Sequence, residues 1–141
     1  MPELVRSIVA RLREYVGNRR RARRYRMRLS CRVAPFDAAL DPERQRRAPA
    51  LAGHTRDLSV TGLALVLPAV RVGDRYLTGA GLRLRVTLEH PSGPLELLCA
   101  PVRHEQLEPG GAETGFLIGV RITELAAADR ARYEAHLAQL D

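Results

Sequence analysis

Arginine is concentrated in one short block near the start of the chain. Eight arginines, and no aspartate or glutamate, lie between Arg19 and Arg32, whereas the rest of the chain carries slightly more acids than arginines. The block therefore holds the whole formal net charge of +7. A guanidinium binds phosphate bidentately, pairs with the O6/N7 edge of guanine and stacks on bases. The block predicts a phosphate or nucleotide site; the alternative is a solvated basic segment without a specific ligand.

A second group of polar residues interrupts two alternating apolar stretches. Asp57, Ser59 and Gly62 fall at this interruption, which places them on a turn between strands. Aspartate and serine bond their own backbone in such turns, and glycine adopts conformations closed to other residues, so an ordinary turn is one interpretation. The other is a binding site, in which the carboxylate accepts hydrogen bonds from the N–H groups of a base and the hydroxyl adds a polar contact.

The other reactive residue types show no catalytic or metal-binding pattern. Cys31 lies on the apolar face of a predicted strand and Cys99 in an apolar run, so both are predicted to be core residues. The chain has four histidines without metal-ligand spacing: His54, His90, His104 and His136. It contains no P-loop, no G-x-G-x-x-G and no paired-carboxylate motif. We therefore expect a protein that is not an enzyme and uses neither a cofactor nor a metal.

Short strands must position these residues. Alternation of apolar and polar residues predicts a strand over 25–33, whose solvated outer face carries Arg26, Arg28 and Arg32. Further strands are predicted from His54 to Leu67 with the interruption at 59–62, over 82–88 and 95–102 as a hairpin, and over 116–122. Residues 34–53, with three prolines and a charged run, are predicted to form a loop. A closing helix is expected over 126–140, with Tyr133, Leu137 and Leu140 on one stripe.

The first residues of the chain predict a separate element. Leu4, Ile8, Leu12 and Val16 recur at helical spacing, which indicates an amphipathic helix over residues 1–17. We interpret it as a helix that docks on the domain's own core; the alternatives are a homodimer contact and docking on a partner. The remaining residues, 18–141, suffice for one domain. No apolar run reaches the roughly 20 residues that span a membrane, and two distant cysteines favour a reduced, cytoplasmic protein.

The two polar motifs together resemble the PilZ domain family. Arg19-Arg20-Arg21-Ala22-Arg23-Arg24, followed by the predicted strand, is similar to the R-x-x-x-R motif and first strand of that family. Asp57-Leu58-Ser59-Val60-Thr61-Gly62 is similar to its second motif, [D/N]-x-S-x-x-G. The resemblance runs from about Arg19 to the C-terminus. It implies a mainly β fold, a small six-stranded antiparallel β-barrel with a C-terminal helix, that binds the bacterial second messenger cyclic di-GMP.

The resemblance also implies which residues bind the ligand: Arg19, Arg20, Arg24, Asp57, Ser59 and Gly62. The strand that follows places the motif pair at Arg20 and Arg24, with Arg19/Arg23 as the competing register. An arginine at position 19 implies a stacked pair of cyclic di-GMP molecules. The arginines suit the phosphates and the O6/N7 edges of the ligand, and Asp57 suits the guanine N1–H and N2–H groups. Arg103 or His104 is a candidate for stacking on a guanine.

These expectations lead to one main hypothesis and two alternatives. The main hypothesis is a receptor in which the ligand orders residues 18–24 against the barrel near Asp57, reorients the N-terminal helix and so regulates an effector protein. The alternatives are a nucleic-acid-binding basic domain and a PilZ-like protein–protein adaptor that binds no ligand. A carboxylate beside the arginines disfavours nucleic acid, because it repels a phosphate backbone. Insertion into a membrane is not expected.

Overall fold

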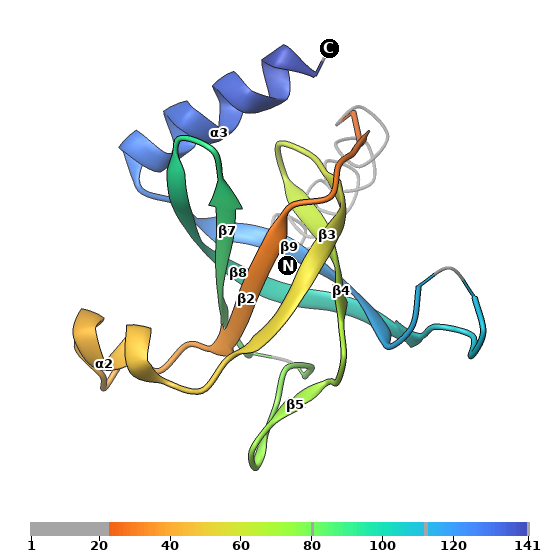
Figure 1. Ribbon diagram of the computed structural model, residues 1–141. Coiled ribbons are helices and arrows are strands. Elements are labelled where there is room, and N and C mark those ends of the chain that lie inside the picture. Colours follow the sequence, from red (N-terminus) through yellow and green to blue (C-terminus); the bar gives the residue numbers. More distant parts are fainter. Residues whose placement is uncertain (1–22, 80, 112, 141) are drawn as a thin grey trace, which may run out of the picture.

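The computed structural model describes residues 23–79, 81–111 and 113–140, in which antiparallel strands wrap into a barrel (Figure 1). The strands are β1 (Tyr25–Arg26), β2 (Ser30–Pro35), β3 (Leu51–Leu58), β4 (Gly62–Leu67), β5 (Arg71–Val72), β6 (Arg75–Tyr76), β7 (Leu84–His90), β8 (Gly93–Gln106) and β9 (Phe116–Glu124). The helices are α2 (Pro42–Arg47) and α3 (Ala127–Gln139). No helix within these residues is long and apolar enough to cross a membrane. The predicted helix over 1–17 lies outside the described residues.

Within the described residues, six strands close the barrel. Their order is β3-β2-β7-β8-β9-β4, and β4 pairs back onto β3, while the short β1 adds to one end of β3. The barrel confirms the fold class predicted from the sequence. Its interior is apolar because alternate residues point inward; Leu84, Val86 and Leu88 of β7, for example, are fully buried. Cys31 and Cys99 are also buried, as predicted for core residues, and burial raises the pKa of each thiol to about 12.

The predicted strand over 25–33 is divided into β1 and β2. Both pair with β3, but the register of β1 differs from that of β2 by one residue. The register of β3 with β4 shifts at the same place, at a bulge between Thr55 and Asp57. The buried Thr55 side chain connects the two pieces, since its hydroxyl donates to the Met27 carbonyl and accepts from the Leu29 N–H at 2.8 Å. The alternation of faces survives the break, and the arginines of this segment lie on the exposed outer face, as predicted.

The prediction of a loop over 34–53 is wrong in part. This stretch contains the end of β2, the short helix α2 and the start of β3. Helix α2 forms because the Asp41 carboxylate accepts a hydrogen bond from the Arg44 N–H at 2.8 Å and because Pro42 suits the first helical turn. The buried side chain of Gln45 donates to the Asp37 carbonyl and fixes the helix to the preceding turn. The helix lacks an apolar stripe, which is why periodicity did not indicate it.

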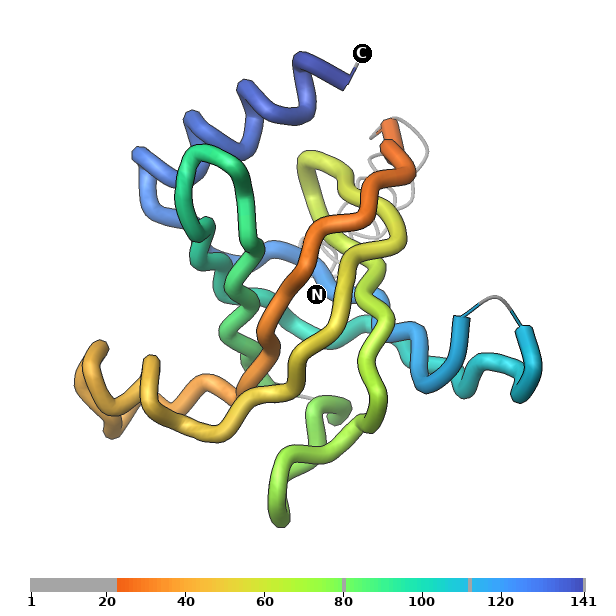
Figure 2. Tube along the Cα trace, viewed as in Figure 1, coloured from red at the N-terminus to blue at the C-terminus, as the bar shows by residue number. Residues whose placement is uncertain are grey.

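The two ends of the barrel are covered by different elements. Helix α3 lies over the end that also carries the β3–β4 turn and the β7–β8 hairpin, whereas α2 and the β5–β6 hairpin lie at the opposite end (Figure 1). Strand β8 is longer than predicted and continues with β9 into a hairpin that projects from the barrel. The tube view shows the first described residues, from Arg23, running along the end of β3 near the β3–β4 turn (Figure 2). There Tyr25 pairs with Leu58. The start of the domain and this turn are therefore neighbours.

Candidate functional site

The β3–β4 turn carries the second polar motif and is built by its own serine. The Ser59 N–H donates to the Gly62 carbonyl at 2.9 Å, and the Gly62 N–H donates to Ser59 Oγ at 3.1 Å. The same oxygen lies 3.2 Å from the Gly62 carbonyl, to which it donates, and 3.3 Å from Thr61 Oγ1. Ser59 is also buried. Its hydroxyl is therefore engaged in shaping the turn.

Gly62 is required by packing and not by its backbone conformation. Its φ is outside the left-handed region, contrary to the expectation that the turn uses a conformation closed to other residues. A Cβ at this position would lie 2.4 Å from the Val120 carbonyl oxygen of β9. The missing side chain thus lets β9 approach the start of β4, with which it pairs.

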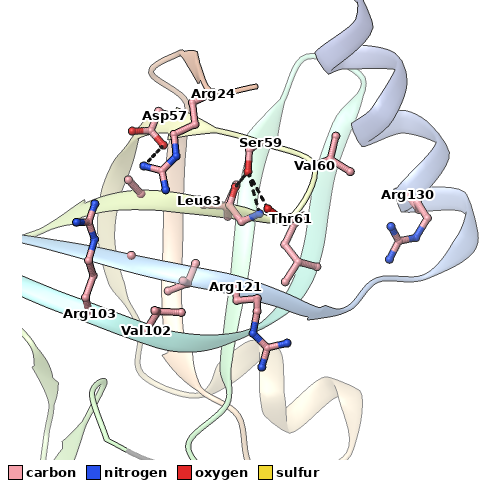
Figure 3. Close-up of a pocket in the computed structure, with 15 residues that line it drawn as sticks. Arg24, Asp57, Ser59, Val60, Thr61, Leu63, Val102, Arg103, Arg121 and Arg130 are labelled. Carbon is pink, nitrogen blue, oxygen red and sulfur yellow. Dashed lines mark hydrogen bonds and ion pairs between the residues drawn. The ribbon is translucent and has the colours of Figure 1, made fainter. Parts of the chain in front are cut away.

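Arg24 and Asp57 meet beside this turn. Arg24 Nη1 lies 3.9 Å from Asp57 Oδ1, and the two side chains are 43% and 19% exposed (Figure 3). Asp57 lies on β3, and its register partner in β1 is Arg26. Arg24 comes directly before β1, so this pairing places it near the carboxylate. The structure brings together one residue from each predicted motif. Arg19 and Arg20 lie outside the described residues.

A concavity of about 350 Å³ opens around this pair. Its wall includes residues of β3, the β3–β4 turn, β4, β8, β9 and α3, and its volume is within the range of small-molecule sites, about 300–1,000 Å³. The charged side chains that line it are Arg24, Arg103, Arg121, Arg130 and Asp57. Four arginines and one carboxylate thus line the concavity, of which Arg24 is paired with Asp57, and exposed Val60 and Val102 add apolar surface.

Arg103 reaches the concavity across a glycine. Its register partner in β9 is Gly119, and its Cγ would lie 3.1 Å from a Cβ at that glycine. The absence of a side chain there lets Arg103 lie over β9 toward the side on which Arg24 and Asp57 project (Figure 3). Of the two candidates for guanine stacking, Arg103 lines the concavity, and His104 is not among its lining residues.

Arg121 and Arg130 were not predicted as site residues. Arg121 lies in the strand predicted over 116–122, and its exposed position in that strand is the signal that could have indicated it. Arg130 comes from α3, where its guanidinium lies 3.7 Å from Glu134. Arg130 lines the site only because α3 packs over this end of the barrel, and a local sequence pattern does not predict that packing.

The described residues contain no group of three or more histidine, cysteine, aspartate or glutamate side chains able to hold a metal. The residues that line the concavity suit a ligand that carries both negative charge and N–H donors. Guanidiniums attract phosphate or a base edge, and the lone carboxylate accepts hydrogen bonds from N–H groups.

Comparison with known proteins identifies the family. The PilZ domain model matches residues 18–139. The chain belongs to the PilZ domain family. This confirms the resemblance inferred from the arginine block and the β3–β4 turn, and it places the protein in a family of receptor domains and not of enzymes.

Solved PilZ structures share the fold at low sequence identity. The PilZ domain of YcgR from Escherichia coli, solved with c-di-GMP, is 13% identical with a TM-score of 0.59; the match covers 86% of this chain and 91% of that one. The inhibitor of motility MotI/DgrA from Bacillus subtilis is 17% identical (TM-score 0.56, 86% of this chain), and MrkH, a c-di-GMP-dependent transcription regulatory factor, is 15% identical (TM-score 0.54, 85% of this chain). The match spans 50% of each of these two proteins. A search of curated protein sequences gives no match.

Proposed function

We propose that this chain is a bacterial receptor for cyclic di-GMP, which binds in the concavity beside the β3–β4 turn. The observation that carries the proposal is a concavity lined by four arginines and a single carboxylate, Asp57, which is paired with Arg24. The ligand has two phosphates and two guanines, and so needs cationic groups for its phosphates and O6/N7 edges and an acceptor for N1–H and N2–H. The ligand bound to the YcgR domain, which has the same fold, supports this choice.

The residues of the two motifs take different roles in this proposal. Arg24, together with Arg20 and the preceding Arg19, binds phosphate and the guanine O6/N7 edge, and Asp57 accepts from the guanine N–H groups. Ser59 and Gly62 hold the turn so that Asp57 faces the concavity, because the serine hydroxyl bonds within the turn. Arg103 stacks on a guanine from the β8 side.

Two finer features belong to the same proposal. Arg19 supports binding of a stacked pair of ligand molecules, and the lining arginines beyond Arg24 provide charge for a second pair of phosphates. Ligand binding orders residues 18–24 against the barrel, reorients the N-terminal segment and changes the surface offered to an effector protein in the cytoplasm. The family's regulators of motility and transcription support a role of this kind.

Titration calorimetry with cyclic di-GMP tests the proposal. The variants are Arg20→Ala, Arg24→Ala and Asp57→Ala; Arg32→Ala is the matched control, since Arg32 is an exposed arginine on the outer face of β2. Each charge-assisted hydrogen bond contributes roughly 1.5–3 kcal/mol, so each site variant should weaken binding at least about tenfold and the control should not.

The outcomes separate the hypotheses. Absence of binding by the wild type refutes the receptor function and leaves the ligand-free adaptor. One ligand per chain refutes only the stacked pair. Binding of a single-stranded oligonucleotide that falls steeply with salt, without binding of cyclic di-GMP, would favour the nucleic-acid alternative.

A further inference from the structure

Helix α3 connects the β3–β4 turn to a cluster of polar residues at the β7–β8 hairpin. Tyr133 contacts the turn, while Arg132 and His136 contact the hairpin. The helix lies over the end of the barrel that carries both the turn and the hairpin (Figure 1). The proposed ligand contacts use none of these three side chains.

The contact with the turn is made by a buried hydroxyl. Tyr133 is 1% exposed, and its Oη donates to the Ser59 carbonyl at 2.6 Å. The Ser59 N–H and hydroxyl bond to Gly62, so the carbonyl is the remaining polar group of this residue, and Tyr133 is its partner in the described structure. The hydroxyl therefore fixes the orientation of the peptide that follows Ser59, two residues after Asp57.

The contact with the hairpin is a chain of neutral imidazoles. The Ser92 N–H donates to His90 Nδ1 at 3.1 Å, so His90 carries its proton on Nε2. His90 Nε2 then donates to His136 Nδ1 at 2.8 Å, with the rings edge to face. His136 consequently carries its proton on Nε2, which is buried and has no partner among the described residues. In this arrangement both rings are neutral, and the Ser92 hydroxyl, 2.7 Å from His90 Nδ1, can donate to the same nitrogen.

Protonation of His136 is opposed by its surroundings. Burial lowers the pKa of His136, and the neighbouring His90 lowers it further. On α3 itself, the Arg132 guanidinium donates to Ser92 Oγ at 3.2 Å and to the Pro94 carbonyl at 2.9 Å, and it is paired with Asp129 at 2.7 Å. A proton on His136 Nδ1 would face His90 Nε2, which carries the donor of the existing hydrogen bond.

We propose that α3 is a positioning element for the ligand-binding turn, held in place by the neutral His90–His136 pair and released when the pair takes up a proton. Tyr133 and His136 are three residues apart, so they share one face of the helix and move together. Acid thus loosens the helix at the hairpin and withdraws the Tyr133 hydroxyl from the turn. The consequence for cyclic di-GMP rests on the proposed function; the consequence for the turn does not.

Amide hydrogen exchange of the ligand-free full chain tests the positioning role. Tyr133→Phe removes only the hydroxyl, and Tyr76→Phe is the control, because Tyr76 is 55% exposed on β6 at the opposite end of the barrel. Exchange of the Ser59 and Gly62 amides should rise about five- to tenfold in Tyr133→Phe relative to the Val86 amide of the core, and remain unchanged in the control. Calorimetry should show a weakening of cyclic di-GMP binding of similar size. Unchanged exchange at Ser59 and Gly62 overturns the proposal, whereas failure of the wild type to bind cyclic di-GMP overturns only the proposed function.

The acid dependence is tested by the same measurement at about pH 7.5 and about pH 5.5, corrected for intrinsic exchange. In the wild type, protection of Ser59 and Gly62 relative to Val86 should fall at the lower pH. His136→Gln should abolish this change, and His104→Gln, which alters an exposed histidine of β8, should retain it. His90→Gln provides a second test from the barrel side if the His136 variant fails to fold. Protection in the wild type that is independent of pH overturns the release step.

Discussion

Replacement of Asp57 by alanine should separate binding from stability. The ion pair with Arg24 spans 3.9 Å, at which two unit charges interact by about 1 kcal/mol in water and about 4 kcal/mol at an effective dielectric constant of about 20. Because the Arg24 side chain is 43% exposed, solvent screens the pair, and exposed pairs of this kind contribute about 0.2–1 kcal/mol. Asp57→Ala should therefore lower the free energy of unfolding by less than about 1 kcal/mol.

The effect on binding should be much larger. A carboxylate that accepts from a guanine contributes roughly 1.5–3 kcal/mol for each hydrogen bond, so loss of one bond weakens binding by about tenfold to 150-fold. Calorimetry with cyclic di-GMP and urea unfolding of the same samples give the two quantities. Asp74→Ala, which removes an exposed carboxylate from the β5–β6 turn, is the control and should change neither. If Asp57→Ala binds within about twofold of the wild type, the assignment of Asp57 to guanine is wrong; if it unfolds the protein, the carboxylate has a structural role that the geometry does not account for.

Three further predictions follow from the packing and the titratable groups. Gly62→Ala should lower the free energy of unfolding by about 1–3 kcal/mol in urea, because its Cβ would lie 2.4 Å from the Val120 carbonyl oxygen; an unchanged midpoint would contradict this close approach. Cys31 and Cys99 have thiol pKa values raised to about 12, so iodoacetamide at about pH 8 should leave both unmodified in the native protein and alkylate both in urea. The pKa of His136 is lowered from 6.5, so the unfolded state binds more protons below that pH and the free energy of unfolding should fall as the pH decreases through about 6.5. His136→Gln should reduce this slope in urea unfolding, and an identical slope in both proteins would exclude His136 as its source.

Local patterns predicted the features that depend on local rules. Alternation over residues 25–33 assigned the faces correctly, since a half-buried strand places every second side chain in the core whether or not it is continuous. The break between β1 and β2 was not predicted because it depends on Thr55, a residue 26 positions from Leu29 whose hydroxyl occupies the place of a ladder hydrogen bond. In contrast, α2 depends on a local cap at Asp41 that the sequence does display, and the prolines and charges around it concealed that signal.

The same distinction applies to the site. Asp57 and Ser59 could be placed on a turn between strands because the interruption of two apolar runs is a local signal. Arg103 was a candidate for stacking, but its convergence with Arg121 and Arg130 could not be predicted, because β8, β9 and α3 bring the three together only after the barrel closes. Only the motif resemblance pointed to a shared site. The residues it implied come before β1, from β3, from the β3–β4 turn and from the start of β4, with Arg103 or His104 of β8 as the candidate for stacking.

The geometry of the β3–β4 turn also changes how its motif produces specificity. The Ser59 hydroxyl and N–H both donate to the Gly62 carbonyl, and the Ser59 carbonyl accepts from the Tyr133 hydroxyl. Every polar group of this residue is therefore hydrogen-bonded in the absence of a ligand. Gly62 has no side chain, and this allows the Val120 carbonyl of β9 to lie against it. Both residues thus shape the turn that follows Asp57, and neither of these roles requires contact with a guanine. Asp57 is the single carboxylate among the lining residues, so on the proposed function it distinguishes a ligand with N–H donors from any other polyanion. In the proposed receptor the arginines therefore provide attraction for phosphate in general, and selectivity for guanine depends on the Asp57 carboxylate, two residues before the carbonyl that Tyr133 of helix α3 binds.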